Sequence, residues 1–405
     1  MELLSRIWGR LKGNPAALYS LILVSVWRSL LEIFNQVQAI YGVHTSQYSS
    51  QLFHLTRWAH WDSGWYLDIV TSGYRHIHIA SGQENFAFFP MFPTSVKYIG
   101  ALTHINFIVV GLLLNFLLTI VAAYFLYKIA EIIAVRQGNL SAQSIHRVAI
   151  LSVVGLLLFP ASYFMEAFYA ESFLLAGTLG AIYYSLSNKL WQAALFIAIA
   201  TATKSLGLVA LLTAGVIVLE QAMKGWPGYV SLLKKWLILS TGLSGLLSYA
   251  LYLWIKFGDP LLFYKIQASW GRSNEGFFVT NILDRYYAHI LQPSYFTNTF
   301  NYTLNLFIMA IPILILAEVF YIALRYKTYW PAVLGVFALA IPLSTGIMES
   351  LNRYIILTIP LFSFLITDTI DRKKMRWVLL TSLIASALLM TYFLNGYLDG
   401  VYFAG

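Results

Sequence analysis

The sequence predicts an all-α protein that crosses a membrane several times. Apolar residues make up 59% of its 405 residues, whereas charged residues make up only 11%, too few to cover a soluble domain of this size. Apolar stretches close to the roughly 20 residues needed to cross a bilayer recur along the whole chain. Transmembrane β-strands would instead show alternating segments of roughly 10 residues between turns.

Hydropathy predicts eleven spans in a single domain, residues 1–405, because neither an internal repeat nor a separate soluble region is visible. The spans are expected at 16–37, 105–130, 148–165, 167–187, 190–203, 205–222, 236–256, 302–324, 330–346, 351–369 and 377–395. Another apolar helix, at 87–102, is expected to dip into the membrane interface without crossing it.

The basic residues predict the orientation of these spans. With the N-terminus in the cytoplasm, most of the 26 Lys and Arg residues fall at cytoplasmic span ends or in short loops, as the positive-inside rule requires. This explains the net charge of +9 without a nucleic-acid partner. Two long loops, 38–104 and 257–301, then lie outside the cytoplasm. Their dense aromatic residues argue against disorder and favour short surface helices, for example at 62–72 and 278–290.

Several kinds of chemistry find no support in the sequence. The chain has no cysteine, which excludes disulfides and thiolate metal sites. It lacks the GxxxxGK[ST], GxGxxG and HExxH patterns of nucleotide binding and zinc proteolysis. His76 and His78 resemble a metal pair, but no further ligand spacing accompanies them. We therefore predict neither a metal ligand nor a cofactor.

The most informative stretch is Arg57–Tyr66, which follows the first span and contains Arg57, His60, Trp61, Asp62 and Tyr66. Ionisable residues at membrane depth are candidates for a functional site. Asp62 could act as a general base whose pKa is set by Arg57 or His60. The alternative is a helix cap in an interfacial loop, because Asp62 directly precedes a predicted helix.

A polar group, Gln83–Asn85, precedes the aromatic run Phe86–Pro93. Two prolines limit helix continuation there, and Phe88, Phe89 and Phe92 suit contact with an acyl or isoprenoid chain. An interfacial aromatic belt is an equally good interpretation.

Four further charged residues are expected on the outer side. Glu171 lies at a tight hairpin that also contains Glu166, and Lys204 is expected at a similar depth as its partner. Arg272 and Arg353 could hold a phosphate, since guanidinium matches phosphate oxygens bidentately. Structural ion pairs and snorkelling anchors are the competing interpretations. Within the first span, Arg28 and Glu32 lie four residues apart and are expected to neutralise each other.

These motifs together resemble the GPI mannosyltransferase 2 (PIG-V-like) family and its bacterial relatives. The resemblance begins with His60-Trp61-Asp62, Tyr66, Gly73-Tyr74, Glu84 and Phe88-Phe89-Pro90-Met91-Phe92-Pro93. It continues in order through Tyr169-Ala170-Glu171-Ser172, Thr203-Lys204-Ser205-Leu206-Gly207, Gly258-Asp259-Pro260 and Asn352-Arg353-Tyr354. The likeness therefore covers roughly residues 57–360, although position 204 departs from the arginine expected in the family.

The resemblance implies an all-α GT-C glycosyltransferase whose active site faces away from the cytoplasm, in a bacterial cell membrane or the endoplasmic reticulum. It implies a polyprenyl-phosphate sugar donor, typically dolichyl-phosphate mannose in eukaryotes, and an inverting transfer in which Asp62 deprotonates the acceptor hydroxyl. The acceptor is expected to be a lipid, glycan or protein.

From these combined arguments we expect three groups of contacts around Asp62. His60, Trp61, Tyr66, Glu84 and Glu171 would contact the acceptor, Lys204, Arg272 and Arg353 the donor phosphate, and Phe88, Phe89 and Phe92 the lipid tail. A secondary transporter or lipid flippase is the alternative, and it predicts charges at mid-span and repeated broken helices.

Overall fold

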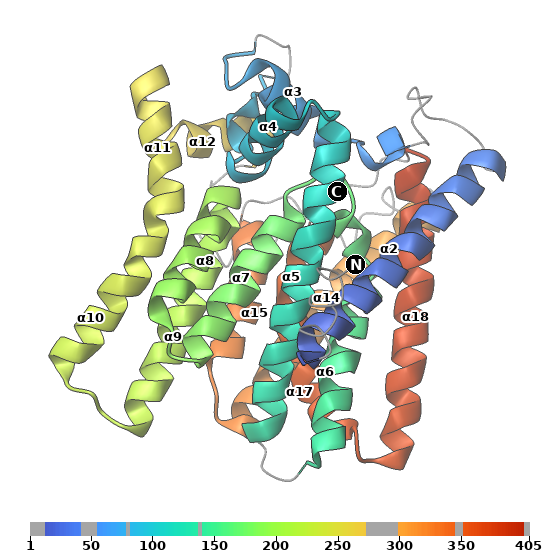
Figure 1. Cartoon of the computed structure of the whole chain (residues 1–405), viewed down its shortest axis with the longest axis vertical. Helices are drawn as coiled ribbons and strands as arrows, with labels where there is room; N and C mark the ends of the chain where they lie inside the picture. The colour runs from blue at the N-terminus through green and yellow to red at the C-terminus, as the bar shows by residue number, and fades with distance from the viewer. Residues whose placement is uncertain are drawn as a thin grey trace.

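The computed structural model describes residues 13–41, 55–77, 82–136, 140–272, 299–344 and 351–400. Within these ranges every regular element is helical. The long helices run roughly side by side as a bundle, and the short helices α3 (Ser63–Ser72), α4 (Met91–Thr103) and α12 (Leu262–Lys265) gather at one end of it (Figure 1). The prediction of an all-α protein is confirmed.

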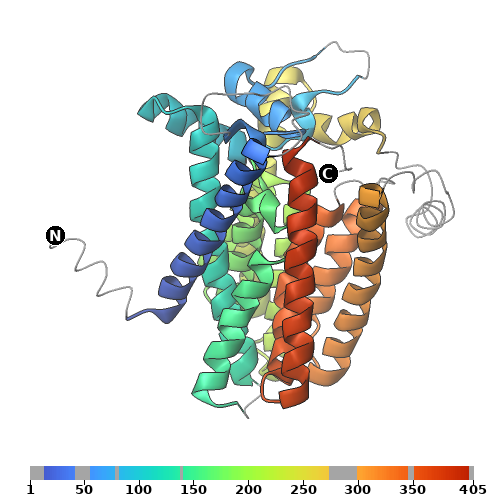
Figure 2. The same cartoon turned by 90° about the vertical axis from the view of Figure 1, so that its right-hand side faces the viewer.

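The bundle is built from helices along the whole chain. The first half contributes α2 (Pro15–Tyr41), α5 (Phe107–Arg136), α6 (Ala142–Leu157), α7 (Glu171–Leu186), α8 (Leu190–Thr203) and α9 (Leu208–Lys224). The second half contributes α10 (Tyr229–Ser240), α11 (Ser244–Phe257), α14 (Thr299–Tyr326), α15 (Trp330–Ser344), α16 (Leu351–Tyr354), α17 (Ile359–Thr369) and α18 (Lys373–Leu398). Figure 2 shows α2 crossing the bundle obliquely beside the upright α18.

Six helical segments in the described part of the chain are long and apolar enough to cross a membrane. They are Pro15–Ile40, Phe107–Arg136, Ser205–Lys224, Tyr229–Phe257, Leu351–Thr369 and Lys373–Leu398. Three apolar helices, Ala142–Leu157, Leu190–Thr203 and Trp330–Ser344, are shorter. The chain is therefore a multi-pass membrane protein, and the count of eleven spans stays a prediction.

Helix α7 lies at the centre of the bundle. It packs against α5, α8 and α9, and nearly all of its side chains are buried. A helix that is apolar all round is expected in such a position, surrounded by other helices. The first residue of α7, Glu171, is thereby held at a buried helix end.

The third predicted span, 148–165, is wrong at its end. Helix α6 stops at Leu157, and a buried hairpin with a 3-10 turn at Ser162–Met165 leads into α7. Pro160 explains the stop, because proline lacks the backbone N–H of a continuing helix and disfavours helical geometry in the preceding residue.

The surface helix expected at 62–72 corresponds to α3, and the interfacial helix expected at 87–102 corresponds to α4. The surface helix expected at 278–290 lies outside the described residues.

The expected Arg28–Glu32 pair is also wrong. Arg28 instead forms an ion pair with Glu166 of the buried hairpin and donates to the carbonyl of Leu112 at 3.2 Å. Glu32 accepts a hydrogen bond from the indole of Trp58 at 3.0 Å. Arg28 thus joins α2 to the buried hairpin, whereas Glu32 accepts from Trp58 and from the amides of its helical neighbours Asn35 and Gln36.

Candidate active site

Four charged side chains that are far apart in the sequence meet at the end of the bundle near α3. Arg353 Nη1 lies 2.8 Å from Asp62 Oδ2 and 3.7 Å from Glu171 Oε1. Lys204 Nζ donates to the same oxygen of Glu171. We call Asp62, Glu171, Lys204 and Arg353 the charged quartet. The expected partnership of Glu171 with Lys204 is confirmed.

Asp62 points into the quartet and does not cap its helix. It occupies the N-cap position of α3 but makes no side-chain capping hydrogen bond. The preceding residue, Trp61, has a φ of +53°, a left-handed conformation that non-glycine residues rarely adopt. The interpretation of Asp62 as a helix cap is therefore wrong for its side chain.

Backbone hydrogen bonds hold the loop that carries Asp62. The carbonyl of Trp58 accepts from the backbone N–H of Phe168 at 2.8 Å and from the hydroxyl of Tyr397 at 3.1 Å. The hydroxyl of Tyr169 donates to the carbonyl of His60 at 3.1 Å. The buried hairpin and α18 together fix the loop, so the position of Asp62 depends on both.

Lys204 is positioned by a break between α8 and the 3-10 turn Ser205–Gly207. Its backbone is extended, and its carbonyl accepts from the N–H of Gly207 at 2.9 Å. The turn is so tight that a Cβ on Gly207 would lie 2.1 Å from the carbonyl oxygen of Ala200. Only glycine fits there, which accounts for the Thr203–Gly207 motif.

Aromatic rings surround the two cations of the quartet. The guanidinium carbon of Arg353 lies 5.1 Å from the ring centroid of Tyr169 and 5.4 Å from that of Phe164. Lys204 Nζ lies 4.9 Å from the centroid of Tyr354. Such contacts stabilise buried cations.

Tyr354 is a site residue that the sequence analysis did not single out. Lys204, Arg272, Arg353 and Asp62 are the charged residues that act on it electrostatically. Arg272, whose Nη1 donates to Gln267 Oε1 at 2.7 Å, is thereby placed near the quartet. The signal in the sequence for Tyr354 was its position next to Arg353 in the motif Asn352-Arg353-Tyr354.

The members of the quartet differ in their access to solvent. The side chains of Arg353 and Glu171 are each 2% exposed, whereas that of Asp62 is 22% exposed. Asp62 Oδ1 has no hydrogen-bond partner within the described ranges. The carboxylate therefore keeps one oxygen for an incoming group while the other is held.

Tyr66 lies on the first turns of α3 and is buried beside the quartet. Burial raises the pKa of its hydroxyl well above the usual value, and the carboxylates of Glu171 and Asp62 raise that pKa further. Tyr66 therefore remains protonated and can only donate or accept a hydrogen bond as a neutral phenol.

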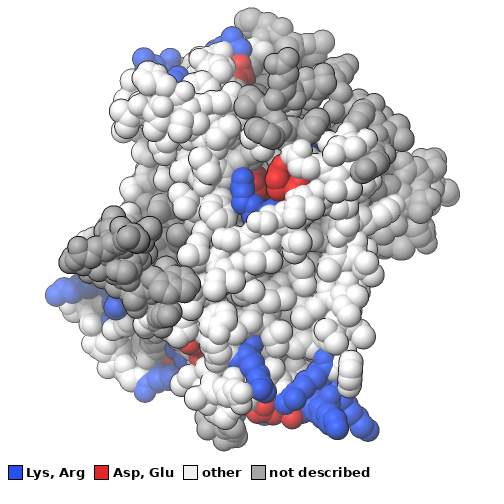
Figure 3. Space-filling model, turned by 45° about the vertical axis from the view of Figure 1, so that its right-hand side comes forward, with Lys and Arg blue, Asp and Glu red and all other residues white. Residues whose placement is uncertain are grey.

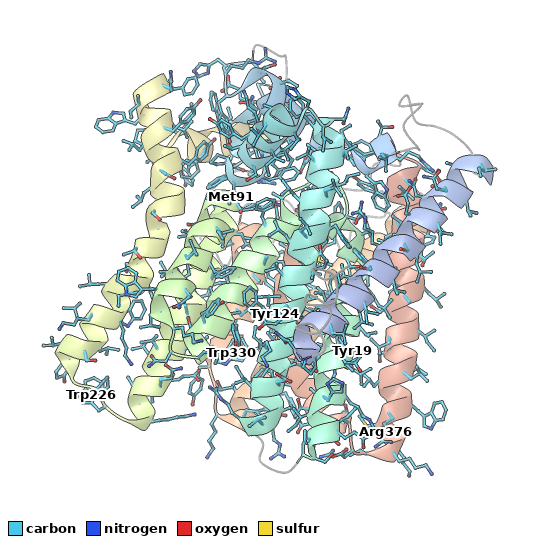
Figure 4. The ribbon with its side chains drawn as sticks, viewed as in Figure 1. Tyr19, Met91, Tyr124, Trp226, Trp330 and Arg376 are labelled. Carbon is cyan, nitrogen blue, oxygen red and sulfur yellow. The ribbon has the colours of Figure 1, made fainter. Side chains whose placement is uncertain are left out.

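The three phenylalanines expected to contact a lipid tail are buried inside the protein. Phe88 packs against Tyr66 and Trp270, with ring centroids 5.1 and 5.4 Å apart. Phe92 lies 4.9 Å from Phe168, and Phe89 packs against Tyr249 and Phe263. Side chains crowd at this end of the molecule, near Met91 (Figure 4). A role in lipid binding stays a prediction. Phe88 and Phe92 pack against Tyr66 of α3, whereas Phe89 packs against α11 and α12.

The other residues expected to contact the acceptor, His60, Trp61 and Glu84, do not belong to the charged quartet. His60 is buried, with its ring 5.5 Å from that of Tyr397, and Trp61 is partly exposed. Glu84 Oε1 lies 3.1 Å from His76 Nδ1 and joins the loop that precedes the aromatic run. Arg57, expected to set the pKa of Asp62, instead bonds to Asn35 and to the carbonyl of Leu398.

In the part of the chain that the structure describes, no group of three or more His, Cys, Asp or Glu residues could hold a metal ion. His76 is engaged with Glu84, and His78 lies outside the described residues.

Comparison with known proteins gives two matches. Residues 18–345 match the family described as mannosyltransferase (PIG-V). Among solved structures, the chain is similar to the crystal structure of ArnT from Cupriavidus metallidurans bound to undecaprenyl phosphate. That similarity has a TM-score of 0.49 and 12% sequence identity, and it covers 94% of this chain and 76% of the other. No curated protein matches this sequence.

The family match covers most of the chain and includes three members of the quartet, Asp62, Glu171 and Lys204. The prediction of an all-helical membrane protein is confirmed, and the GT-C type of its fold stays a prediction. The chain belongs to the mannosyltransferase (PIG-V) family and is a membrane glycosyltransferase.

Proposed function

We propose that the protein transfers a hexose, mannose in keeping with its family, from a polyprenyl-phosphate donor to a hydroxyl of a lipid, glycan or protein outside the cytoplasm. The observation that carries this proposal is the charged quartet. It combines a partly exposed carboxylate, Asp62, with two largely buried cations, Arg353 and Lys204.

The charges of the site suit such a donor. Asp62 and Glu171 contribute two negative charges, and Lys204, Arg272 and Arg353 contribute three positive charges, which leaves one positive charge. A polyprenyl phosphosugar is a phosphodiester with one negative charge, so the site can neutralise it. When the sugar leaves, the phosphate becomes a monoester with a second ionisable oxygen, and Lys204 and Arg353 are placed to stabilise that developing charge.

The reaction then needs one base and no separate acid. Asp62 Oδ1 accepts the proton of the acceptor hydroxyl as the hydroxyl oxygen attacks the anomeric carbon. The bond between that carbon and the phosphate oxygen breaks, polyprenyl phosphate leaves, and the configuration inverts. Arg353 holds Asp62 Oδ2 at 2.8 Å, which orients the carboxylate for this proton transfer.

Glu171 and Tyr66 are placed to orient the acceptor beside Asp62, as the electrostatic contacts of Tyr66 with both carboxylates support. His60 and Trp61 act through the loop that positions Asp62. Glu84 contributes through the neighbouring loop, where it bonds to His76 and to the N–H of Ile77.

The charge distribution supports an extracytoplasmic site. Lys and Arg side chains gather at the lower end of the molecule, opposite the short helices (Figure 3). Under the positive-inside rule that lower end faces the cytoplasm, so the quartet faces the other side.

The direct test is sugar transfer by the purified protein from labelled polyprenyl-phosphate mannose to a mixture of acceptor lipids and glycans. We expect transfer by the wild type and a loss of about 100-fold or more in Asp62→Asn, because the amide cannot accept the proton. Asp68→Asn is the matched control, since Asp68 lies on the same helix but pairs with Arg75. A folded Asp62→Asn protein with full activity would remove Asp62 from the mechanism.

A further inference from the structure

An open cavity lies at the opposite end of the bundle from the quartet. It has a volume of about 200 Å³ and lies between α6, the end of α17 and the start of α18. Its wall is mainly apolar, formed by Leu151, Ile370, Leu379 and Leu383, and two arginines, Arg147 and Arg376, complete it. An apolar cavity with two guanidinium groups differs from an ordinary gap between lipid-facing helices.

The two arginines are not neutralised by the protein. Arg376 Nε donates to the carbonyl of Ile370 at 2.7 Å, which holds the guanidinium in place. Neither arginine has an ion-pair partner in the described ranges of the chain. The nearest acid in the sequence, Asp371, accepts a hydrogen bond from Ser144 at 2.8 Å.

Two cations on other helices lie close to acids. Lys128 pairs with Glu131, and Arg325 lies 4.0 Å from Asp368. Beside the cavity, by contrast, Arg372, Lys373 and Lys374 add further positive charge at the start of α18. Figure 4 places Arg376 at that end of α18, and Figure 3 shows basic side chains gathered at the same end of the molecule. The region has a local excess of positive charge beside an apolar wall.

We propose that this cavity binds one anionic phospholipid, with its phosphate between Arg147 and Arg376 and an acyl chain along the leucines. Guanidinium groups match phosphate oxygens bidentately, and basic pockets between membrane helices are suited to anionic headgroups. Leu380, which lines the cavity, and Trp377, next to Arg376, are exposed on α18, so the cavity borders the outer surface of the bundle. The positive-inside rule accounts for the basic residues at this end, and the lipid site rests on the convergence of two of them on one apolar wall.

The proposal commits to a lipid because the wall is apolar as well as charged. A free phosphate or a nucleotide would use the arginines but would leave the accessible wall residues Leu151, Leu379 and Leu380 uncovered. An acyl chain removes that apolar surface from water, at roughly 25 cal/mol for each Å² buried. The lipid also joins α6 to α18, which lie on either side of the cavity.

The test uses the full chain in neutral detergent, with phosphatidylglycerol and phosphatidylcholine of identical acyl chains added in separate titrations. Retention is read by native mass spectrometry and stabilisation by the thermal unfolding midpoint. We expect phosphatidylglycerol to bind more tightly to the wild type and to raise its midpoint. Arg147→Gln/Arg376→Gln should weaken that binding by about tenfold or more, the effect of losing charge-assisted hydrogen bonds.

The matched control is Lys189→Gln/Lys224→Gln, which removes two exposed positive charges from the same end of the bundle, away from the cavity. It should bind phosphatidylglycerol as the wild type does. Because Arg376 also bonds to the carbonyl of Ile370, Arg147→Gln alone provides a variant without that loss, and it should show a smaller decrease in the same direction.

Three outcomes would overturn the proposal. The first is equal binding of phosphatidylglycerol and phosphatidylcholine by the wild type. The second is a loss of phosphatidylglycerol binding in the lysine control as large as that in the double arginine variant. The third is stabilisation by glycerol phosphate, which has no acyl chains, as large as that by phosphatidylglycerol. The first two would reduce the effect to general surface charge, and the third would indicate an anion site only. None depends on sugar transfer, so the lipid site and the proposed transferase reaction can fail separately.

Discussion

At the scale of single residues, the pair Lys204–Glu171 is almost withdrawn from solvent, with 14% and 2% of the side chains exposed. Lys204→Met leaves the Glu171 carboxylate buried with only Arg353 nearby, at 3.7 Å, and removal of one partner of a buried pair costs about 3–5 kcal/mol. We expect a lowered thermal midpoint and a loss of sugar transfer. The double variant Lys204→Met/Glu171→Gln should recover the midpoint, because the carboxylate is gone, but not the transfer.

This double variant separates a structural from a catalytic role. If transfer returned together with stability, the pair would only support the fold. The exposed pair Lys265–Asp259 is the control, and Lys265→Met/Asp259→Asn should change neither the midpoint nor the transfer rate, since exposed pairs contribute little.

His60 gives a prediction about pH. Burial, together with the positive charge of Arg57, lowers the pKa of its imidazole to about 4 from the usual 6.5. Between these two values the unfolded chain binds more protons than the folded chain, so stability falls as the pH drops from about 6.5 and levels off near pH 4. The difference corresponds to about 3 kcal/mol.

The measurement is thermal unfolding in detergent between pH 7.5 and 4.5, with His60→Gln as the comparison. Carboxylates titrate in part of this range in both proteins, so the difference between the two curves isolates the imidazole. His76→Gln, a half-exposed histidine, should keep the wild-type slope. A His60→Gln curve parallel to the wild type would contradict the prediction.

Some site residues could be predicted from the sequence and others could not. Asp62 could be predicted because it is an acid in an aromatic loop directly after a span, and Glu171–Lys204 because both lie near span ends. The partner of Asp62 could not, because Arg353 lies 291 residues away and meets it only through the packing of α16 against the rest of the bundle. Arg57 was the wrong choice for the same reason, since its partners lie on α2 and at the end of α18.

At the scale of elements, the turn after α8 determines where Lys204 points. Gly207→Ala would put a Cβ 2.1 Å from the carbonyl oxygen of Ala200, so the turn must open and move Lys204 away from Glu171. We expect at least a tenfold loss of sugar transfer, roughly 1.4 kcal/mol in the barrier, and a lowered midpoint. Gly225→Ala is the matched control, because a Cβ there meets nothing within 4 Å.

The helices themselves were predictable where apolar periodicity is long, and less so where polar turns interrupt it. Helices α2, α5 and α18 lie close to their predicted ranges. The stop of α6 at Leu157 was missed because the following hairpin is as apolar as a span, so hydropathy alone does not mark its end. Pro160 was the available signal, and it was outweighed by the hydropathy.

At the scale of the whole molecule, Arg57 joins the first and last described helices, α2 and α18, to the loop that carries Asp62. Its Nη1 donates to the carbonyl of Asn35 on α2 at 3.0 Å, and its Nη2 donates to the carbonyl of Leu398 on α18 at 3.1 Å. It also lies 3.6 Å from Asp399. Helices α2 and α18, which are far apart in the sequence, thus meet beside the loop of Asp62, an arrangement that requires both to be packed in the bundle.

Arg57→Met should therefore loosen the site without touching the reacting groups. The substitution keeps much of the apolar stem but leaves buried carbonyls without a donor, at about 1–3 kcal/mol for each. We expect a lowered midpoint and a kcat reduced about tenfold, with KM for the donor little changed, because the phosphate contacts are on other elements. Arg75→Met, which removes an exposed pair with Asp68, should leave kcat near the wild-type value. An Arg57→Met protein with a normal kcat and a lowered midpoint would show that Arg57 holds the bundle together without positioning Asp62.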